Sequence, residues 1–308
     1  MTNSTVFTLF EGHYHLGAAA LFNSLHQAGF RGTCYAGVRH LPPPWTSAGR
    51  DGRHVFEGPD GFRVEIILLE TDYHLTNYKP VFFTRLWEEF CPDVERLFYI
   101  DPDVIVKRQW SYFEDWVDYG VALVQDVNPV MPLDHPVRQA WQRFCQESGF
   151  TVRNALQCYY NGGFVGVHRK HAEFIGTWHD LMQAGTRFGF SLDAFSQEMN
   201  RYPYFSNSDQ DFLNIAAMVS TVPLSTVGPA EMDFFSGGTL LSHAMGRLKP
   251  WRRNYLSRVL QGIPPGEPDK RFWHAARGPI QIFKPGFLRF KRLELAAAAA
   301  IGRVYRRT

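Results

Sequence analysis

The sequence predicts an α/β protein built on a parallel or mixed sheet that helices cover on both faces. Its 308 residues are 45% hydrophobic and 15% aromatic, which is enough apolar side chain for a large core. Along the first half, short apolar runs that suit buried strands alternate with longer amphipathic stretches that suit helices. This alternation is typical of strand–helix units, in which helices cover the sheet formed by the strands.

The elements of the first half follow one another in that order. A helix is expected at residues 16–28 because Gly29 suits a helix C-terminus. Residues 41–61 are rich in Pro, Gly and charge, and are expected to form a long loop. A second, amphipathic helix is expected at residues 78–90. The expected strands are residues 6–9, 33–38, 63–69, 97–100 and 120–124.

The second half is less regular. A strand is expected at residues 160–167, entered through the Asn161-Gly162-Gly163 turn, and helices at 171–184 and 209–219. No G-x-G-x-x-G follows the first strand, which disfavours a dinucleotide fold of the usual type. We expect one main domain at residues 1–250 and a basic helical C-terminal extension at residues 251–308.

Two carboxylates, Asp101 and Asp103, come directly after the buried run 97–100. An apolar core disfavours unpaired charges, whereas hard divalent cations prefer oxygen ligands and are often shared with substrate phosphates. In α/β sheets, ligands bind beyond the carboxyl ends of the strands, where this pair falls. The pair therefore predicts a divalent metal that presents a phosphorylated substrate. A plain Asx-capped turn would also explain the pattern.

Composition narrows the class of protein. The four cysteines show no metal-site spacing, and no apolar run approaches the roughly 20 residues of a membrane span. A first strand that begins almost at once leaves little room for a signal peptide, so we expect a cytoplasmic protein. The net charge of +2 hides an asymmetry: residues 247–308 carry 15 Lys and Arg but only three acidic residues. A basic tail on an acidic body suggests a negatively charged partner, and no nucleic-acid-binding module accompanies it.

Four motifs follow one another along the chain: Asp101-Pro102-Asp103, Tyr160-Asn161-Gly162-Gly163, Ser208-Asp209-Gln210-Asp211, and His243 to Trp251 with the pattern H-x-x-G-x-x-K-P-W. In this order they resemble the retaining glycosyltransferases of the glycogenin and lipopolysaccharide-galactosyltransferase type, glycosyltransferase family 8. The resemblance covers roughly residues 5–251. It implies a GT-A fold, a nucleotide-sugar donor, and Mn²⁺ or Mg²⁺ as the metal.

The resemblance also implies roles for single residues. The metal would be held by Asp101, Asp103 and His243, and the diphosphate by Lys249, on a turn that contains Gly246. Asp209 and Gln210 would act at the anomeric carbon of the donor sugar, as the catalytic pair. The other donor contacts would come from Thr8, Tyr14 (stacking on the base), Arg85, Asp101, Asp126, Asn161 and Gly162.

Five of these residues also have an ordinary structural explanation. Tyr14 could simply pack at the start of a helix, and Arg85 could lie on a helix surface. Asp126 could be a solvated residue at a strand end. His243 suits a hydrogen-bonded core histidine, and Asp209 a helix cap.

The expected function is metal-dependent transfer of glucose or galactose from a nucleotide sugar, UDP being the favoured nucleotide, to a saccharide or glycolipid acceptor. Retention of configuration follows from the resemblance. The alternatives are an inverting GT-A transferase, a sugar nucleotidyltransferase, or a non-catalytic protein that binds nucleotide sugars or carbohydrates. Basic residues of 284–308 flank the apolar stretch 293–301 and suit contact with an anionic membrane, and a helix packed on the protein's own body also explains them.

Overall fold

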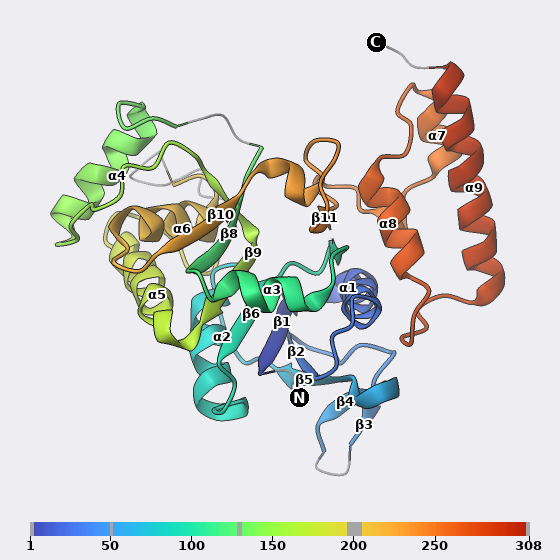
Figure 1. The fold of residues 1–308 in the computed structure, drawn as a ribbon, viewed down its shortest axis with the longest axis horizontal. Coiled ribbons are helices and arrows are strands. Elements are labelled where there is room, and N and C mark those ends of the chain that lie inside the picture. Colours follow the sequence, from blue (N-terminus) through green and yellow to red (C-terminus); the bar gives the residue numbers. More distant parts are fainter. Residues whose placement is uncertain (1–2, 50–51, 128–130, 196–204, 306–308) are drawn as a thin grey trace. The chain divides into compact units, whose positions relative to one another are not determined.

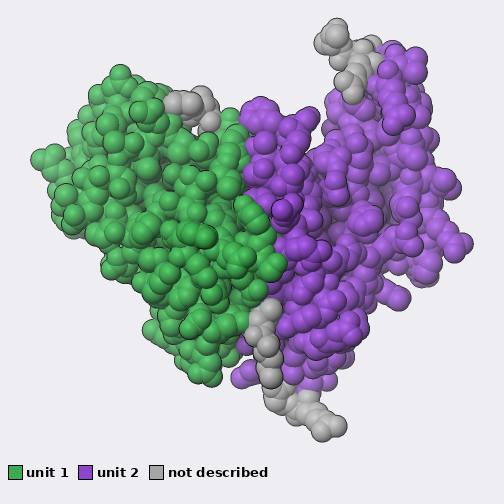
Figure 2. All heavy atoms as spheres, in the orientation of Figure 1, with its two compact units in different colours: residues 1–9, 69–100, 111–229 green, residues 10–68, 101–110, 230–308 purple. Residues whose placement is uncertain are grey.

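The computed structural model describes residues 3–49, 52–127, 131–195 and 205–305. The chain divides into two compact units, coloured separately in Figure 2. Unit 1 comprises residues 1–9, 69–100 and 111–229, and unit 2 comprises residues 10–68, 101–110 and 230–308. Each unit is assembled from separate stretches of the chain. The domain boundary expected at 250/251 stays a prediction.

Unit 1 is built on five strands in the order β10-β8-β9-β6-β1. Strand β9 runs antiparallel to β6 and β8, whereas the pairs β1–β6 and β8–β10 are parallel. The central strands are almost wholly buried, which explains their continuous apolar runs. The strands are β1 (Ser4–Phe10), β6 (Arg96–Ile100), β8 (Val121–Gln125), β9 (Tyr160–His168) and β10 (Leu224–Val227).

Helices pack on this sheet (Figure 1). Helix α6 (Ser208–Val219) contacts β9 and α5 (Glu173–Thr186), and α2 (Lys79–Arg85) contacts α5 and β6. The helix expected at 78–90 is α2 followed by a π-helical turn at Leu86–Phe90. The expected helices at 171–184 and 209–219 are confirmed as α5 (Glu173–Thr186) and α6. Two further helices, α3 (Trp110–Val117) and α4 (Pro136–Glu147), were not expected.

Unit 2 contains four strands in the order β2-β5-β4-β3. Strands β2 (Thr33–Val38) and β5 (Arg63–Leu68) are parallel, and β4 (His54–Glu57) and β3 (Ser47–Ala48) continue the sheet antiparallel. The expectation of a plain loop at 41–61 is therefore wrong. The alternating side chains of His54-Val55-Phe56-Glu57 place Val55 in the core, and pairing with β5 supplies the hydrogen bonds that local composition could not reveal.

A second, two-stranded sheet in unit 2 pairs β7 (Val104–Val106) antiparallel with β11 (Leu241–His243), with His243 opposite Val104. Helix α1 (His15–Gln27) packs against β7 and α8. The remaining helices belong to the C-terminal extension and are α7 (Tyr255–Leu260), α8 (Glu267–Ala275) and α9 (Pro285–Val304).

The extension shares a hydrophobic core with α1 and β7. That core contains Ala20 and Ile105 together with Trp251, Tyr255 and Trp273 of the extension. Buried Asn23 of α1 makes two hydrogen bonds of 3.0 and 2.9 Å to the backbone of Ile280. In the described part of the chain, no helix is both long and apolar enough to cross a bilayer. The expected α/β class is confirmed.

Candidate active site

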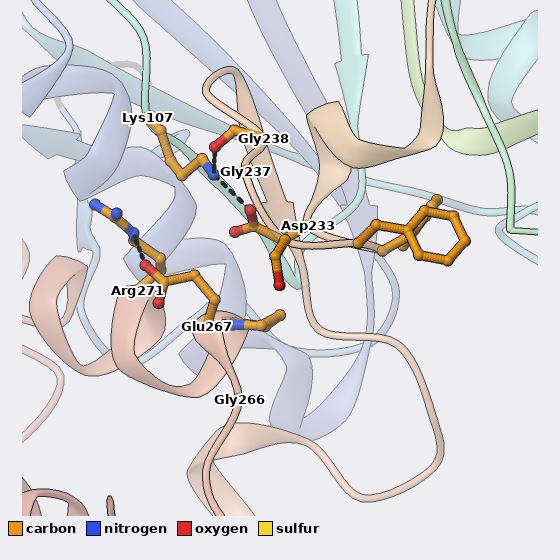
Figure 3. A pocket seen from close by; sticks show the side chains of 11 residues that line it. Lys107, Asp233, Gly237, Gly238, Gly266, Glu267 and Arg271 are labelled. Carbon is orange, nitrogen blue, oxygen red and sulfur yellow. Dashed lines mark hydrogen bonds and ion pairs between the residues drawn. The ribbon is translucent and has the colours of Figure 1, made fainter.

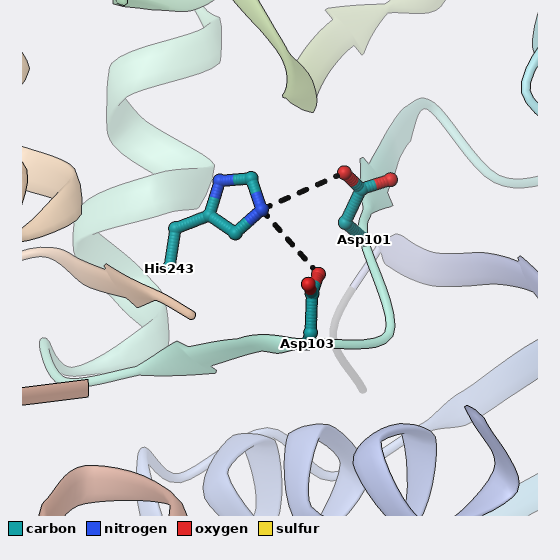
Figure 4. A group of neighbouring side chains, drawn as sticks. All are labelled: Asp101, Asp103 and His243. Atoms are coloured by element: carbon teal, nitrogen blue, oxygen red, sulfur yellow. Dashed lines mark ion pairs between the residues drawn. The ribbon is translucent and has the colours of Figure 1, made fainter. Parts of the chain in front are cut away.

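Asp101, Asp103 and His243 form a cluster in unit 2 in which each side chain offers one ligand atom within 4.8 Å of the others (Figure 4). His243 Nε2 lies 3.4 Å from Asp103 Oδ1 and 3.9 Å from Asp101 Oδ2. The cluster follows from local pairing, because β11 aligns His243 with the residue after Asp103. The Ala244 N–H also donates to the Asp103 carbonyl at 3.0 Å, which extends this pairing to the turn.

Lys249 completes this cluster. Its ammonium donates to Asp103 Oδ2 and, at 3.0 Å, to the carbonyl of Ala244. One oxygen of Asp103 thus faces the lysine and the other faces His243. The turn between His243 and Lys249 passes through Gly246, whose φ of +88° is in the left-handed region that favours glycine.

The charges of this cluster shift its pKa values strongly. Burial alone would raise the pKa of Asp103, but the positive charges of His243 and Lys249 hold it well below its usual range. Burial alone would lower the pKa of His243 and Lys249, yet Asp103 outweighs it and raises both. The carboxylate is therefore held in its charged form, as a metal ligand must be.

The donor set suits a divalent metal. Two carboxylates and one imidazole match the ligand preferences of Mn²⁺. The two carboxylates also match the preference of Mg²⁺ for oxygen ligands. His243 Nδ1 is buried and has no hydrogen-bond partner in the described residues, whereas Nε2 is directed at both carboxylates. The predicted metal ligands are thus brought together, with Lys249 beside them.

Tyr14 lies near this cluster, in the turn Gly12–Tyr14 before α1. Lys249 Nζ is 5.8 Å from the centre of its ring, and the ring packs edge-on against Trp251 at 5.6 Å. The Tyr14 ring is half-buried, and one of its faces is turned toward the Lys249 ammonium. Burial raises the pKa of the Tyr14 hydroxyl, so the phenol is neutral at physiological pH.

A second polar cluster lies in unit 1 and centres on Lys79. The Lys79 ammonium is 2.7 Å from Asp209 Oδ2 and 2.8 Å from the carbonyl oxygen of Gly162. The Gly162 N–H donates to Gln210 Oε1 at 2.7 Å. A Cβ at Gly162 would lie 3.2 Å from the Asp209 carboxylate, a tight contact that the carboxylate would have to relieve by a small shift.

Asp126 extends the same cluster. Its Oδ2 accepts hydrogen bonds from Asn161 Nδ2 and, at 3.4 Å, from Gln210 Nε2. The Asn161 Oδ1 accepts from the Gly163 N–H at 2.9 Å, which fixes the amide orientation. One network thereby joins Asp126 to the residues predicted from two separate motifs, which are Asn161, Gly162, Asp209 and Gln210.

Two other predicted residues lie outside these clusters. Arg85 forms an ion pair with Glu89, one helical turn away, at 2.9 Å and a hydrogen bond with the Tyr78 hydroxyl at 3.1 Å. Thr8 is fully buried on β1, and its hydroxyl has no hydrogen-bond partner among the described residues. Their roles in donor binding stay predictions.

The sequence analysis missed Lys79. It belongs to no recognised motif, and its only signal is a lysine before Pro80 at the start of a segment that is otherwise apolar through Phe83. A lysine in such a segment needs a buried anion, which here is Asp209, 130 positions along the chain.

Unit 2 also contains a cavity of about 610 Å³ between the loop before β11 and the start of α8 (Figure 3). Its wall includes a buried ion pair between Lys107 and Asp233, at 2.6 Å, and the exposed pair of Glu267 with Arg271. Lys107 also donates to the carbonyl of Gly238 at 2.6 Å. These contacts fasten the segment that leads into β11, and hence His243, to the end of β7.

Comparison with known proteins places the fold. No protein-family model and no curated protein matches the sequence. The structure is similar to the galactosyltransferase LgtC in complex with donor and acceptor sugar analogues, with a TM-score of 0.53 and 15% identity, covering 93% of this chain and 99% of that chain. The structure is also similar to an active-site variant of LgtC in which a glutamine is replaced by glutamate. The TM-score is again 0.53 and the identity is 14%, over 93% of this chain and 99% of that chain.

At this level of identity the similarity concerns the fold and not the reaction. It extends over nearly the whole of both chains, and it confirms the architecture that the resemblance to glycosyltransferase family 8 implied. The chain therefore has the GT-A fold, as it is found in the galactosyltransferase LgtC.

Proposed function

We propose that this protein is a metal-dependent glycosyltransferase that moves a hexose from a nucleotide sugar to a saccharide or glycolipid acceptor. The observation that carries the proposal is the cluster of Asp101, Asp103 and His243 with Lys249 bonded to Asp103. This cluster suits a cation and a diphosphate together, and it occurs in a GT-A fold. Glucose or galactose linked to UDP is the proposed donor, as the family resemblance implies.

Asp101, Asp103 and His243 would hold Mn²⁺ or Mg²⁺. When bound, the metal would neutralise charge on the nucleoside diphosphate that leaves. Lys249 would give a second positive charge to the same diphosphate, and its contact with Asp103 keeps the ammonium in position before the donor arrives. Tyr14 would offer the face of its ring to the nucleotide base.

The residues of the Lys79 cluster would act on the sugar. Transfer breaks the bond between the anomeric carbon and the diphosphate oxygen, and it forms a bond from that carbon to an acceptor oxygen, whose proton is lost. Gln210 and Asp209 would stabilise positive charge at the anomeric carbon, which supports transfer with retention. The Lys79 ammonium holds the Asp209 carboxylate in one orientation, and the Gly162 N–H does the same for the Gln210 amide oxygen.

The direct test is release of nucleoside diphosphate from UDP-galactose, UDP-glucose and other nucleotide sugars, with Mn²⁺ or Mg²⁺ and a panel of saccharides. We expect turnover with one donor and a metal, and a decrease of about 10²–10³ in kcat for Lys249→Met. The control is Lys170→Met, which removes an exposed lysine from a short helical turn in unit 1. NMR of the first product gives the anomeric configuration.

The possible outcomes separate the rival functions. Binding of a nucleotide sugar without turnover or hydrolysis would favour a non-catalytic binding protein. A product of inverted configuration would identify an inverting transferase. Release of pyrophosphate from a nucleoside triphosphate and a sugar phosphate would identify a sugar nucleotidyltransferase.

We further propose peripheral contact of the C-terminal helix with an anionic membrane, on its cytoplasmic face. Helix α9 exposes Phe290, Leu293 and Val304, at 58%, 71% and 93% of their surface, beside basic side chains. Arg306 and Arg307, which are part of the same expectation, lie outside the described residues. Sedimentation of the protein with vesicles of anionic phospholipid, and not with phosphatidylcholine alone, is the expected result. Equal sedimentation with both, or with neither, would contradict it.

A further inference from the structure

A basic cavity lies in unit 2, between the α8–α9 connection and the first turns of α9. Its volume is about 340 Å³, and its wall contains the side chains of Arg277, Arg289 and Arg292. Phe283 and Leu288 form an apolar part of the same wall, and no acidic residue lines it. Helices α8 and α9 are in contact with each other, and Figure 1 shows the connection that joins them.

The three arginines have no carboxylate to pair with in the described part of the extension. Its three acidic residues are all engaged with other cations: Glu267 with Arg271 and Lys270, Asp269 with Arg253, and Glu294 with Lys291. These three exposed arginines line one cavity and carry three positive charges, so an anion placed there lowers the electrostatic energy. The site is therefore suited to a ligand with at least one negative charge.

The start of α9 adds to this positive field. Lys284 caps the helix without a side-chain hydrogen bond, and no acidic residue lies in the first turn. The first backbone N–H groups of the helix consequently have no side-chain acceptor, and the helix dipole favours an anion beside them. Pro285, the first helical residue, lies on the cavity wall.

A groove next to the cavity indicates the rest of the ligand. It has a volume of about 280 Å³, shares Arg292 with the cavity, and runs between α8 and α9 past Trp273, Leu295 and Ala299. Its lining is mainly apolar, so it suits a hydrocarbon chain attached to the group at the arginines. A guanidinium group donates two parallel hydrogen bonds to a phosphate or a carboxylate, and a phosphate has enough oxygens to accept from more than one of the three arginines.

We propose that this cavity binds the phosphate group of a lipid, with part of the apolar chain in the adjacent groove. The proposal deepens the membrane contact proposed above and rests on it, but it does not depend on the transfer reaction. A lipid-borne phosphate at Arg277, Arg289 and Arg292 would hold α9 against the membrane at one defined point. A general attraction between basic residues and anionic lipid would not distinguish these arginines from the others.

The test uses the full-length protein and isothermal titration calorimetry with dihexanoyl phosphatidic acid below its micellar concentration. We expect saturable binding at one site, and at least roughly tenfold weaker binding in Arg289→Gln/Arg292→Gln, because charge-assisted hydrogen bonds are lost. The matched control is Arg258→Gln/Arg303→Gln, which removes the same charge from α7 and α9 outside the cavity. The control is expected to bind within about twofold of the wild type. Thermal unfolding checks that both variants are folded.

Two further arms identify the source of the phosphate. Inorganic phosphate is expected to compete with the lipid but to bind at least roughly tenfold more weakly, because it gains nothing from the apolar groove. Ala296→Gln, at an exposed groove position, is expected to weaken lipid binding and leave phosphate binding unchanged. Equal loss in the control variant, or equal affinity for phosphate and lipid, would overturn the proposal. Nucleotide-sugar binding, expected to be unchanged in all these variants, reports separately on the proposed transferase site.

Discussion

The ammonium of Lys79 and the carboxylate of Asp209 lie 2.7 Å apart, with only 3% and 4% of these side chains exposed. Removing both charges from water costs several kcal/mol, which good geometry and further hydrogen bonds offset. The carbonyl of Gly162 accepts one such bond from the lysine, and the Lys79 ammonium also lies 4.6 Å from the centre of the Tyr99 ring. This pair fixes the residue that we place under the donor sugar.

Lys79→Met is expected to lower the free energy of unfolding by about 3–5 kcal/mol, because it leaves a buried carboxylate without this cation. Urea unfolding followed by fluorescence measures the change. Arg85→Met is the control on the same helix: its partner Glu89 is 48% exposed, so a loss below about 1 kcal/mol is expected. Equal losses would show that the Lys79 pair contributes no more than a surface pair.

Asp211 makes stability depend on pH. Burial raises its pKa from 3.8 to about 6, although the Asn207 N–H and the Tyr159 hydroxyl donate to its oxygens. Because the pKa is higher in the folded state than in the unfolded chain, its contribution to stability is full below pH 3.8 and is lost as pH rises through 6. The loss amounts to about 3 kcal/mol at most.

The measurement is urea unfolding of the wild type and of Asp211→Asn between pH 4 and 7. Asparagine does not ionise, so the stability of the wild type relative to the variant is expected to decrease over this interval. The difference isolates Asp211 from other titrating groups. A difference that stays constant with pH, or that grows in favour of the wild type, would contradict the raised pKa.

At the scale of elements, helix α1 supports the turn that carries the two carboxylates. A Cβ at Gly17 would lie 2.3 Å from the carbonyl oxygen of Pro102 and 2.7 Å from the ring of Trp251. The helix can therefore approach Asp101-Pro102-Asp103 only because residue 17 has no side chain. Any larger residue must push the helix and the turn apart.

Gly17→Ala is accordingly expected to destabilise the protein by about 1–3 kcal/mol and to weaken Mn²⁺ binding. Gly176→Ala is the control: it lies within α5, and a Cβ there meets nothing within 4 Å. In that position alanine should stabilise the helix by about 0.5–1 kcal/mol. Thermal unfolding and Mn²⁺ titration of both variants give the comparison. A Gly17→Ala protein as stable as the wild type would contradict this close packing.

Elements with a strong local signal could be predicted from the sequence. The continuous apolar runs predicted β2, β6 and β9 almost residue by residue, and the turn at Asn161-Gly162-Gly163 marked the start of β9. The hairpin β3–β4 and helix α4 could not be found in this way. Each lies among Pro, Gly and charged residues. Strand β4 is stabilised by its pairing with β5, and α4 is stabilised by the burial of Trp141 and Phe144.

At the scale of the whole chain, the extension completes the core of unit 2. Trp251, Tyr255 and Trp273 share one cluster with Ala20 and Ile105. Asn23 of α1, fully buried, has Ile280 as its hydrogen-bond partner on both amide atoms. These residues of the extension therefore contribute to the core of unit 2.

A chain ending at residue 250 is expected to lose cooperative unfolding of unit 2 and to be cut by protease within residues 10–68. Trp251→Ala in the full chain tests the same core with a single substitution. It is expected to lower the free energy of unfolding by about 3–5 kcal/mol. Limited proteolysis and urea unfolding are the measurements. A truncated chain as protease-resistant and as stable as the full chain would show that residues 251–308 fold separately.

The candidate site was partly accessible from sequence for a similar reason. The motifs around Asp103, His243, Asp209 and Gln210 are local, so the family resemblance could point to them. Lys79 and the Lys107–Asp233 pair depend on partners more than 100 positions away, which local pattern does not reveal. The unexpected part of the site is thus its long-range buried charge pairing, not its local motifs.

The most direct test of the proposed donor site is a thermal-shift titration of UDP, GDP, CDP and ADP with and without Mn²⁺. A ligand at a hundredfold excess over its Kd stabilises the folded protein by about 2.7 kcal/mol. We expect a shift that needs one nucleotide together with Mn²⁺, is absent in Asp103→Asn, and persists in the exposed control Asp115→Asn. No shift with any nucleotide in the presence of Mn²⁺, or the same shift in Asp103→Asn, would contradict a metal-dependent nucleotide-sugar site at Asp101, Asp103 and His243.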